Sequence, residues 1–271
     1  MKMNKKNKTK LSIVVPAYKE ERNIYKTIKA IVESHDKLPY SYEVIVVVDG
    51  SPDKTATAAR KHKSENVKVF EYFPNQGKGH ALKYGTDRAS GEIITFTDAG
   101  GDFDPKQFDN CVKLMEVFDA DFVVGSKRHP ASKVDYPMKR RLFSYVYHKL
   151  TRWFLGVKVT DTQAGLKFLK ANVAKDVMPR VLVKQYAFDL EMLVVANQLG
   201  YTRVFEAPVE LSFNDSVSGI NSKTIKTMAL DTLAIFYRAR ILDYYRKQAK
   251  MPKKKLRKTS TKKIKKRKSN K

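Results

Sequence analysis

The stretch YEVIVVVDGSPD, residues 42–53, sets the fold class of this 271-residue chain. A run of mostly β-branched residues ends at Asp49, and a glycine, a serine and a proline follow before the next helical pattern begins. An apolar run of this kind is typical of a strand buried on both faces, as in a parallel sheet covered by helices. We therefore expect an α/β domain.

The same alternation of strand and helix patterns fills the first half of the chain. Strand patterns cover residues 11–15, 42–48, 67–73, 92–97 and 122–125, and helical patterns cover residues 20–34, 54–63, 77–89 and 105–118. Unusual polar and glycine residues follow four strands, at residues 16–18, 49–51, 75–79 and 98–104. Because ligands of such sheets bind at the carboxyl ends of the strands, we expect these four segments to line one cleft.

Two common phosphate-binding motifs are absent from the sequence. No G-x-G-x-x-G follows the first strand pattern, and GKGH at residues 77–80 lacks the Ser or Thr of a P-loop. The chain is therefore expected to be neither a dinucleotide-binding protein nor a P-loop nucleotidase.

The net charge of +26 is concentrated at the two ends. Residues 1–10 hold five Lys, residues 250–271 hold thirteen Lys or Arg, and neither segment has an acidic residue, so about +8 remains on the rest of the chain. We expect a disordered basic arm at 1–10, a single α/β domain at 11–221, a helical extension at 222–249 and a disordered basic tail at 250–271. The tail fits solubility, nucleic-acid binding or attraction to an anionic membrane.

The sequence favours a peripheral protein of a reducing compartment. Cys111 is the one cysteine, no secretory leader pattern is visible, and charges interrupt the longest apolar stretch, residues 225–242. Residues 138–157 place apolar side chains at helical spacing beside several Lys and Arg, which predicts a helix lying in a lipid headgroup layer; a surface helix packed on the domain is the alternative. Residues 230–245 predict a second helix rich in Arg and Tyr.

Three carboxylates follow the fourth strand, in TDAGGDFDP at residues 97–105. Carboxylates on a glycine-containing loop suit Mg²⁺ or Mn²⁺, which prefer oxygen ligands and often complete their shell with phosphate oxygens. The alternative is a helix cap, which we favour for Asp104 because Pro105 follows it. We assign Asp98 to the metal.

Two further loops carry candidate ligand-binding residues. Lys78 lies between two glycines, where its ammonium can reach a phosphate, although ordinary loop chemistry would also explain the glycines. Residues 49–53 read either as part of the ligand site or as a turn that caps the next helix.

Taken together, these segments resemble glycosyltransferase family 2, of GT-A fold, and within it the dolichyl-phosphate mannose and glucose synthases. The 161–165 stretch, DTQAG, with the preceding RHP at 128–130, is more similar to the glucose synthases. The matching stretches run in family order over about residues 11–212, at 14–21, 46–53, 75–79, 98–100, 124–128, 139–141, 161–165 and 188–191.

The resemblance implies transfer of glucose or mannose from UDP-glucose or GDP-mannose to a polyprenyl or dolichyl phosphate, with Mg²⁺ or Mn²⁺, at the cytoplasmic face of a membrane. It implies three overlapping groups of residues. The nucleotide-sugar is expected at Pro16, Ala17, Tyr18, Glu20, Asp49, Lys78, Asp98 and Gln163. Catalysis and phosphate binding are expected at Asp98, Lys127, Arg128, Arg140 and Arg141. The acceptor and the membrane are expected at Arg140, Arg141, Ser144, Trp153 and Phe154.

The sequence departs from the family pattern in three places. Gly100 replaces the second Asp of the usual Asp-x-Asp, and we hypothesise that Asp98 and Asp102 share the ion instead. Val48 replaces the first Asp of the usual Asp-Asp-Gly-Ser. No C-terminal membrane domain is visible, so a lipid acceptor is expected to be reached from the surface.

The expected acceptor decides which residues the chemistry needs. A lipid phosphate is an anion near neutral pH and needs no general base, and in-line displacement inverts the anomeric centre. A sugar hydroxyl, the second candidate acceptor, would need a base, for which Asp161, Asp189 and Glu191 are the candidates; Asp189 and Glu191 also read as charges at a helix N-terminus. A non-catalytic nucleotide-sugar-binding protein and, last, a nucleic-acid-binding protein complete the alternatives.

Overall fold

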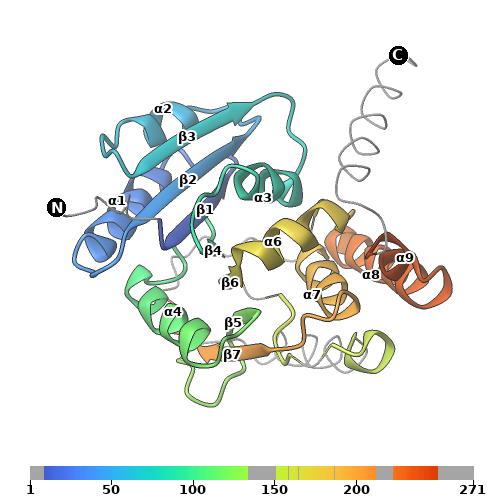
Figure 1. Ribbon diagram of the computed structural model, residues 1–271. Coiled ribbons are helices and arrows are strands. Elements are labelled where there is room, and N and C mark those ends of the chain that lie inside the picture. The colour runs from blue at the N-terminus through green and yellow to red at the C-terminus, as the bar shows by residue number, and fades with distance from the viewer. Residues whose placement is uncertain are drawn as a thin grey trace.

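The computed structural model describes residues 9–133, 151–157, 159–163, 165–185, 187–211 and 222–249. These residues form three layers, with a central sheet between two helical layers (Figure 1). The sheet has seven strands in the order β3-β2-β1-β4-β6-β5-β7. Their bounds are β1 (Leu11–Ala17), β2 (Tyr42–Asp49), β3 (Val67–Tyr72), β4 (Ile93–Phe96), β5 (Phe122–Ser126), β6 (Lys167–Lys170) and β7 (Val204–Pro208).

Helices cover both faces of the sheet. The helices named below are those whose bounds the structure gives. One face carries α1 (Ile24–His35), α2 (Thr55–Arg60) and α4 (Phe108–Val117), which the 3₁₀ turn η1 (Pro105–Gln107) precedes. The other face carries α3 (Lys78–Thr86), α6 (Ala171–Val177), η2 (Met178–Arg180), α7 (Phe188–Gln198), α8 (Ser222–Phe236), the π-helical turn η3 (Tyr237–Ile241) and α9 (Tyr244–Ala249).

The apolar run of residues 42–49 is buried along its whole length, as expected for a strand covered on both faces. Val44, Val46 and Val48 pack against α1 and α2, whereas Ile45 and Val47 face α3. Alternation along one strand therefore supplies both halves of the core.

The sheet is mostly parallel, with one exception. β1 pairs in parallel with β2 and β4, and β5 pairs in parallel with β7, but β6 lies antiparallel between β4 and β5. The predicted α/β fold with a mostly parallel sheet is confirmed, and the carboxyl ends of β1, β2, β4 and β5 meet at one edge.

No described helix is both long and apolar enough to span a bilayer. Both predicted basic ends lie almost entirely outside the described residues, so their disorder stays a prediction. The predicted helix at 230–245 is divided in two, because Asp243, with φ of +48°, lies between η3 and α9.

Candidate active site

Asp49 joins the loop after β2 to the loop after β3. Its carboxylate accepts backbone hydrogen bonds from Gln76 (2.8 Å) and Gly77 (2.8 Å) and one from the Asn75 amide (3.0 Å). Gly50 has φ of +57°, and a Cβ there would lie 2.3 Å from the Asn75 backbone nitrogen, so only glycine fits this approach. Asp49 thus fixes the loop that presents Lys78.

The loop at 51–55 is a hydrogen-bonded turn before α2 as well as a neighbour of the site. The Asp53 carboxylate accepts from the Thr55 backbone N–H (3.1 Å) and from the Ser51 hydroxyl (2.6 Å) at the start of α2. Ser51 also accepts from the Lys19 backbone N–H (2.8 Å), and Thr55 accepts from that of Glu20 (2.9 Å). The segments after β1 and β2 are therefore held together, as the cleft prediction requires.

Lys78 and Asp98 form an ion pair across the site, with Nζ 2.5 Å from Oδ1. Burial alone would raise the pKa of Asp98. The charge and hydrogen bond of Lys78, together with the charges of Lys167 and Lys127, outweigh burial and hold that pKa below its ordinary value. Burial opposes the charged form of Lys78 too, but Asp98, Asp189 and Asp102 together outweigh it and raise the pKa of the ammonium. Both groups are charged at neutral pH.

Asp102 lies beside the position where the family has its second Asp. A Cβ built on Gly100 would lie 3.6 Å from Oδ1 of Asp102. Burial, and next the charge of Asp98, raise the pKa of Asp102 above its ordinary value. Burial also raises the pKa of Glu20, with Asp102 and Asp98 adding to it. The three carboxylates repel one another, which favours a cation among them.

The donor set at this loop fits Mg²⁺ or Mn²⁺. Among the described residues, no group of three or more His, Cys, Asp or Glu is arranged to hold an ion by itself. Mg²⁺ commonly binds one or two carboxylates and completes its shell with phosphate oxygens and water. Asp98 and Asp102 supply such a pair, while Asp104 accepts from the Lys106 backbone N–H (3.0 Å) as the cap of η1, as predicted.

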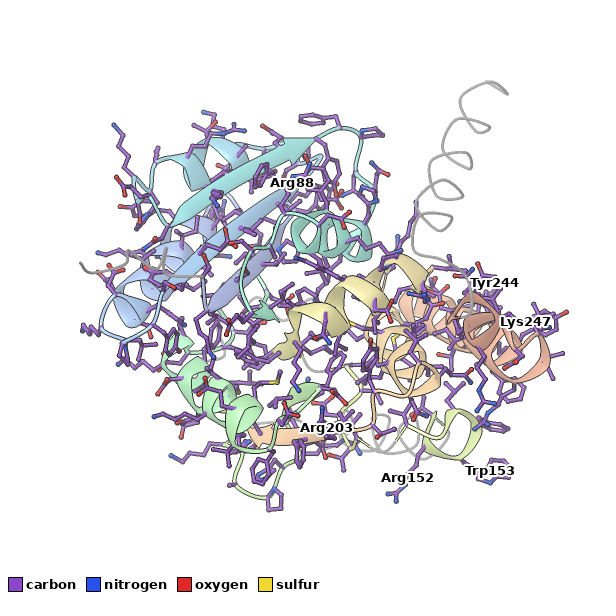
Figure 2. All side chains as sticks on the ribbon, viewed as in Figure 1. Arg88, Arg152, Trp153, Arg203, Tyr244 and Lys247 are labelled. Carbon is purple, nitrogen blue, oxygen red and sulfur yellow. The ribbon has the colours of Figure 1, made fainter. Side chains whose placement is uncertain are left out.

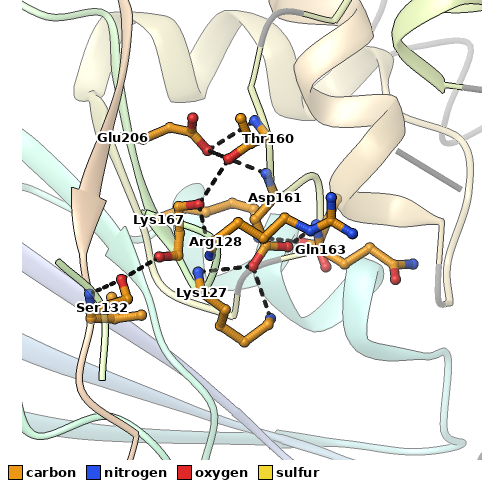
Figure 3. Close-up of polar contacts among 11 residues, drawn as sticks. Lys127, Arg128, Ser132, Thr160, Asp161, Gln163, Lys167 and Glu206 are labelled. Atoms are coloured by element: carbon orange, nitrogen blue, oxygen red, sulfur yellow. Dashed lines mark hydrogen bonds and ion pairs between the residues drawn. The ribbon is translucent and has the colours of Figure 1, made fainter. Parts of the chain in front are cut away.

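A second ion pair lies where β5 ends. Lys127 Nζ is 3.1 Å from Asp161 Oδ2, which also accepts from the Lys127 backbone N–H (3.1 Å), and Oδ1 accepts from the Gln163 backbone N–H (3.1 Å) (Figure 3). Burial opposes ionisation of Asp161, but the charge and hydrogen bonds of Lys127, together with the Gln163 backbone N–H, outweigh burial and lower the pKa of this carboxyl. Glu206 on β7 accepts from the Thr160 backbone N–H (2.9 Å) and fixes the start of the loop.

Gly165 brings this loop against the metal candidate. A Cβ at position 165 would lie 2.4 Å from Oδ2 of Asp98 and 2.9 Å from the ring of Phe103. Both are far inside van der Waals contact, so any larger residue would displace the carboxylate. The 161–165 segment and the 98–102 loop therefore belong to one site.

Lys167 is a buried cation beneath the site that sequence reasoning missed. It begins β6, its side chain is 1 % exposed, and Nζ lies 3.0 Å from Oδ1 of Asp189 at the start of α7. Burial lowers the pKa of Lys167, and Asp189 opposes that shift. The signal available was a lysine between the apolar residues Leu166 and Phe168, directly after the DTQAG segment.

Glu191 is a structural anchor. It is fully buried on α7 and accepts from the backbone N–H groups of Leu182 (2.7 Å) and Val183 (2.6 Å), from the Arg238 guanidinium (2.8 Å) and from the Tyr245 hydroxyl. Its carboxylate thereby holds η3 and α9 on the domain.

The remaining predicted residues divide into three groups. Pro16 and Ala17 end β1 beside Tyr18, which is exposed at the same edge. Arg128 is half-buried next to Lys127, and Gln163 contacts Met228 of α8 (Nε2 to Sδ, 3.8 Å). Trp153 and Phe154 are exposed, and Arg140, Arg141 and Ser144 lie outside the described residues.

The sequence matches the family model of glycosyl transferase family 2 over residues 12–178. It is 31 % identical over 205 residues to the dolichyl-phosphate beta-glucosyltransferase of Drosophila melanogaster and 32 % identical over 203 residues to that of Homo sapiens. The alignments cover 70 % and 69 % of this chain but only 63 % and 62 % of those relatives, so the chain spans less than two thirds of their length. The dolichyl-phosphate beta-glucosyltransferase ALG5C of Trichomonas vaginalis is 30 % identical over 243 residues, covering 84 % of this chain and 72 % of that protein.

Solved structures share the fold at lower identity. The glucosyl-3-phosphoglycerate synthase of Mycobacterium tuberculosis, in complex with Mn²⁺, UDP and phosphoglyceric acid, has a TM-score of 0.64 and 19 % identity over 92 % of this chain and 81 % of that one. The mannosyl-3-phosphoglycerate synthase of Rubrobacter xylanophilus has a TM-score of 0.66 and 18 % identity over 85 % and 74 % of the two chains. The predicted GT-A fold and family resemblance are confirmed, and the chain belongs to glycosyl transferase family 2.

Proposed function

We propose that this protein transfers glucose from UDP-glucose to a polyprenyl phosphate, with inversion at the anomeric carbon, at the cytoplasmic face of a membrane. The relatives named as dolichyl-phosphate beta-glucosyltransferases support the sugar and the acceptor. The DTQAG segment, which packs against Asp98 through Gly165, supports the same choice. The single cysteine, Cys111, is free and buried, which agrees with a reducing compartment.

The observation that carries the choice of acceptor is the state of the three candidate bases. Asp161 forms an ion pair with Lys127, and Asp189 forms one with Lys167. Glu191 is buried, and its carboxylate oxygens already accept hydrogen bonds from the protein. None of these carboxylates is free to remove a proton from a sugar hydroxyl. An acceptor that is already ionised, such as a phosphate monoester, needs no such group.

The positive side chains explain how two phosphorylated substrates are tolerated together. Lys78 and Lys127 line the acidic loop, and Lys167 adds a third positive charge below it. When the donor binds, Lys78 is placed to break its ion pair with Asp98 and to bind the donor diphosphate instead. Lys127 and Arg128 are placed to bind the acceptor phosphate. A Mg²⁺ or Mn²⁺ held by Asp98 and Asp102 would supply Lewis-acid stabilisation of the leaving diphosphate.

The reaction is a single displacement. An acceptor phosphate oxygen attacks the anomeric carbon, a new C–O bond forms, and the bond to the diphosphate breaks with its electron pair leaving on the diphosphate oxygen. The protein's task is to align the two anions, which otherwise repel, and positioning of this kind is a major part of catalysis.

The test is a transfer assay with the purified full chain and either Mg²⁺ or Mn²⁺. UDP-[¹⁴C]glucose and GDP-[¹⁴C]mannose are each offered to a polyprenyl phosphate, the free polyprenol, an alkyl glucoside and 3-phosphoglycerate. We expect label in the lipid phosphate product from UDP-glucose only, and its loss in Asp98→Asn. Transfer to the alkyl glucoside alone would establish the hydroxyl-directed alternative, and nucleotide binding without turnover on any acceptor would establish the non-catalytic one.

A further inference from the structure

Large apolar side chains gather on one exposed face of the molecule. Thirteen are exposed on the described residues, and seven of them belong to residues 151–157 or to the C-terminal helices. Trp153 is 78 % exposed, Leu233 63 % and Ile241 62 %. We define the docking face as six of these seven, which are Trp153, Phe154, Leu230, Leu233, Tyr237 and Ile241.

The docking face is one surface, although two distant segments form it. The rings of Trp153 and Phe154 have centroids 4.6 Å apart, and Phe154 meets Phe236 of α8 edge to face at 5.5 Å. Arg240 Nε donates to the Phe154 carbonyl oxygen at 3.0 Å. The helical residues 151–155 are therefore held against the end of α8 and against η3, and Figure 2 shows Trp153 pointing away from the body of the protein.

The spacing along α8 and η3 produces an amphipathic helix with its apolar stripe outward. Leu230, Leu233, Tyr237 and Ile241 follow one another at three or four residues, the spacing of one helical face. Ile235 and Ala239 are buried against the domain. The helix therefore has a second apolar face that the described residues leave uncovered, and surfaces of this kind mark interaction sites.

Positive charge surrounds the docking face. Of the acidic residues of these segments, Asp231 is half-buried, whereas the Asp243 side chain is 48 % exposed and lies 3.9 Å from Nε of Arg246. Trp and Tyr are the residues enriched where hydrocarbon meets lipid headgroups. Apart from Asp243, the exposed charged side chains of residues 151–157 and of the part of 222–249 whose burial is described are all cations: Arg152, Lys226, Arg240, Arg246 and Lys247.

We propose that the docking face seats the protein on an anionic lipid bilayer, with the apolar side chains inserted among the headgroups and the ring of cations against lipid phosphates. This arrangement is that of an interfacial amphipathic helix, in which apolar burial and electrostatic attraction act together. A protein partner would be expected to meet charges of both signs in similar number, whereas here five cations are exposed and the one exposed carboxylate, Asp243, lies beside Arg246. The proposal rests on the proposed function only for the identity of the acceptor.

The location of the docking face suits a lipid substrate. Met228 of α8 lies two residues before Leu230, and its Sδ is 3.8 Å from Nε2 of Gln163. The helix that meets the membrane therefore touches the DTQAG loop of the site. Asp161 of the same loop holds Lys127 in place.

The first test is vesicle flotation with the full chain in the absence of donor and acceptor. Vesicles of phosphatidylcholine with about 30 % phosphatidylglycerol are compared with pure phosphatidylcholine, at low salt and at about 0.5 M NaCl, where screening shortens the reach of charges. We expect the double variant Leu233→Ser/Ile241→Ser to reduce partitioning at least about ten-fold at either salt. The matched control is Val117→Ser, an equally exposed side chain at the end of α4, which should bind as the parent does.

The electrostatic part is tested separately with Arg152→Gln/Lys226→Gln. Each lost cation should weaken binding to anionic vesicles about five-fold at low salt and change little at high salt. Circular dichroism and UDP binding confirm that every variant is folded. Equal vesicle binding by the Leu233→Ser/Ile241→Ser variant and the parent would overturn the proposal, as would loss of self-association in that variant without loss of vesicle binding.

A second readout separates docking from chemistry. If both proposals hold, the Leu233→Ser/Ile241→Ser variant loses transfer to a long-chain polyprenyl phosphate in vesicles but keeps transfer to a water-soluble short-chain phosphate. If the proposed function fails, neither acceptor is used by any variant, and flotation still decides the membrane proposal on its own.

Discussion

The ammonium of Lys78 and the carboxylate of Asp98 lie 2.5 Å apart, although they come from loops that follow different strands. The carboxylate that a metal ion would bind and the ammonium that a diphosphate would bind therefore neutralise each other within the protein. Substrate binding must exchange this ion pair for two others, one between Asp98 and the metal and one between Lys78 and phosphate. This exchange, and the buried polar interactions that stabilise the surrounding fold, can each be tested.

Removing Lys78 should weaken nucleotide binding. In Lys78→Gln the diphosphate loses a charge-assisted hydrogen bond, and the dissociation constant of UDP with Mn²⁺ should rise about 10- to 100-fold. Isothermal titration calorimetry measures this, with the exposed Lys61→Gln as the control. An unchanged constant in Lys78→Gln would show that the ion pair only holds the loop.

Asp102 should be replaceable by a carboxylate at position 100. Asp102→Ala should lower Mn²⁺ affinity in the presence of UDP, because one of two oxygen donors is lost. Adding Gly100→Asp should restore it, since a Cβ at Gly100 meets nothing closer than Oδ1 of Asp102 itself at 3.6 Å. Electron paramagnetic resonance of bound Mn²⁺ reports both steps. If Asp102→Ala binds the ion as the parent does, Asp102 is not a ligand.

Glu43 should make stability depend on acid pH. Burial opposes its ionisation, but hydrogen bonds from Lys68, Ser12 and Ser90 outweigh burial and lower its pKa to about 2. A lowered carboxyl pKa stabilises the folded state above the unfolded value, and this stabilisation disappears as pH falls from about 4.5 to about 2.

The Glu43 prediction is tested by urea unfolding across that range. Glu43→Gln should cost about 2–3 kcal/mol near pH 7, and the difference from the parent should shrink toward zero by about pH 2. The exposed Glu33→Gln is the control and should show no such slope. A constant difference at every pH would contradict the assignment.

Breaking the Lys167–Asp189 pair should destabilise the protein strongly. Lys167→Met leaves Asp189 buried without this cation, at a cost of about 3–5 kcal/mol, whereas Lys167→Met/Asp189→Leu should cost less than the sum of its single changes. Urea unfolding of the cycle measures the coupling. Lys29→Met, in the exposed Lys29–Glu33 pair, should change the unfolding free energy by less than about 1 kcal/mol. Additive single changes at 167 and 189 would mean that the pair is not coupled.

The sequence predicted the first half of the fold because its signals there are local. Five β-branched runs matched β1 to β5 within a few residues, and the acidic loop and Asp104 cap were recognisable from turn chemistry. β6 was missed because KFLK has lysine at both ends, and nothing local marks Lys167 as buried. Its burial depends on α7, which arrives from another part of the chain.

The site was predicted in outline and not in its pairings. Asp98, Lys78 and Lys127 were named, but that Lys78 pairs with Asp98 and Lys127 with Asp161 follows only from the three-dimensional arrangement of their loops. Glu191 was read either as a possible base for a hydroxyl acceptor or as a charge at a helix N-terminus. Its contacts with Arg238 and Tyr245, far along the chain, make it an anchor.

The antiparallel pairing of β6 restricts how the loop before it can vary in length. Opposite Phe96 of β4 stands Lys167, on the same side of the sheet as Leu169, while Phe168 faces the other helical layer. A slip of one residue would turn the ammonium away from Asp189 and bring a phenyl ring in its place. Because Gly165 is fixed against Asp98 and only one residue separates it from β6, an added residue there must shift this register. An insertion of one residue at this junction would therefore exchange the two faces of β6, whereas an insertion of two would keep Lys167 and Phe168 on their own sides, so parity, more than loop size, constrains how this active site can diverge.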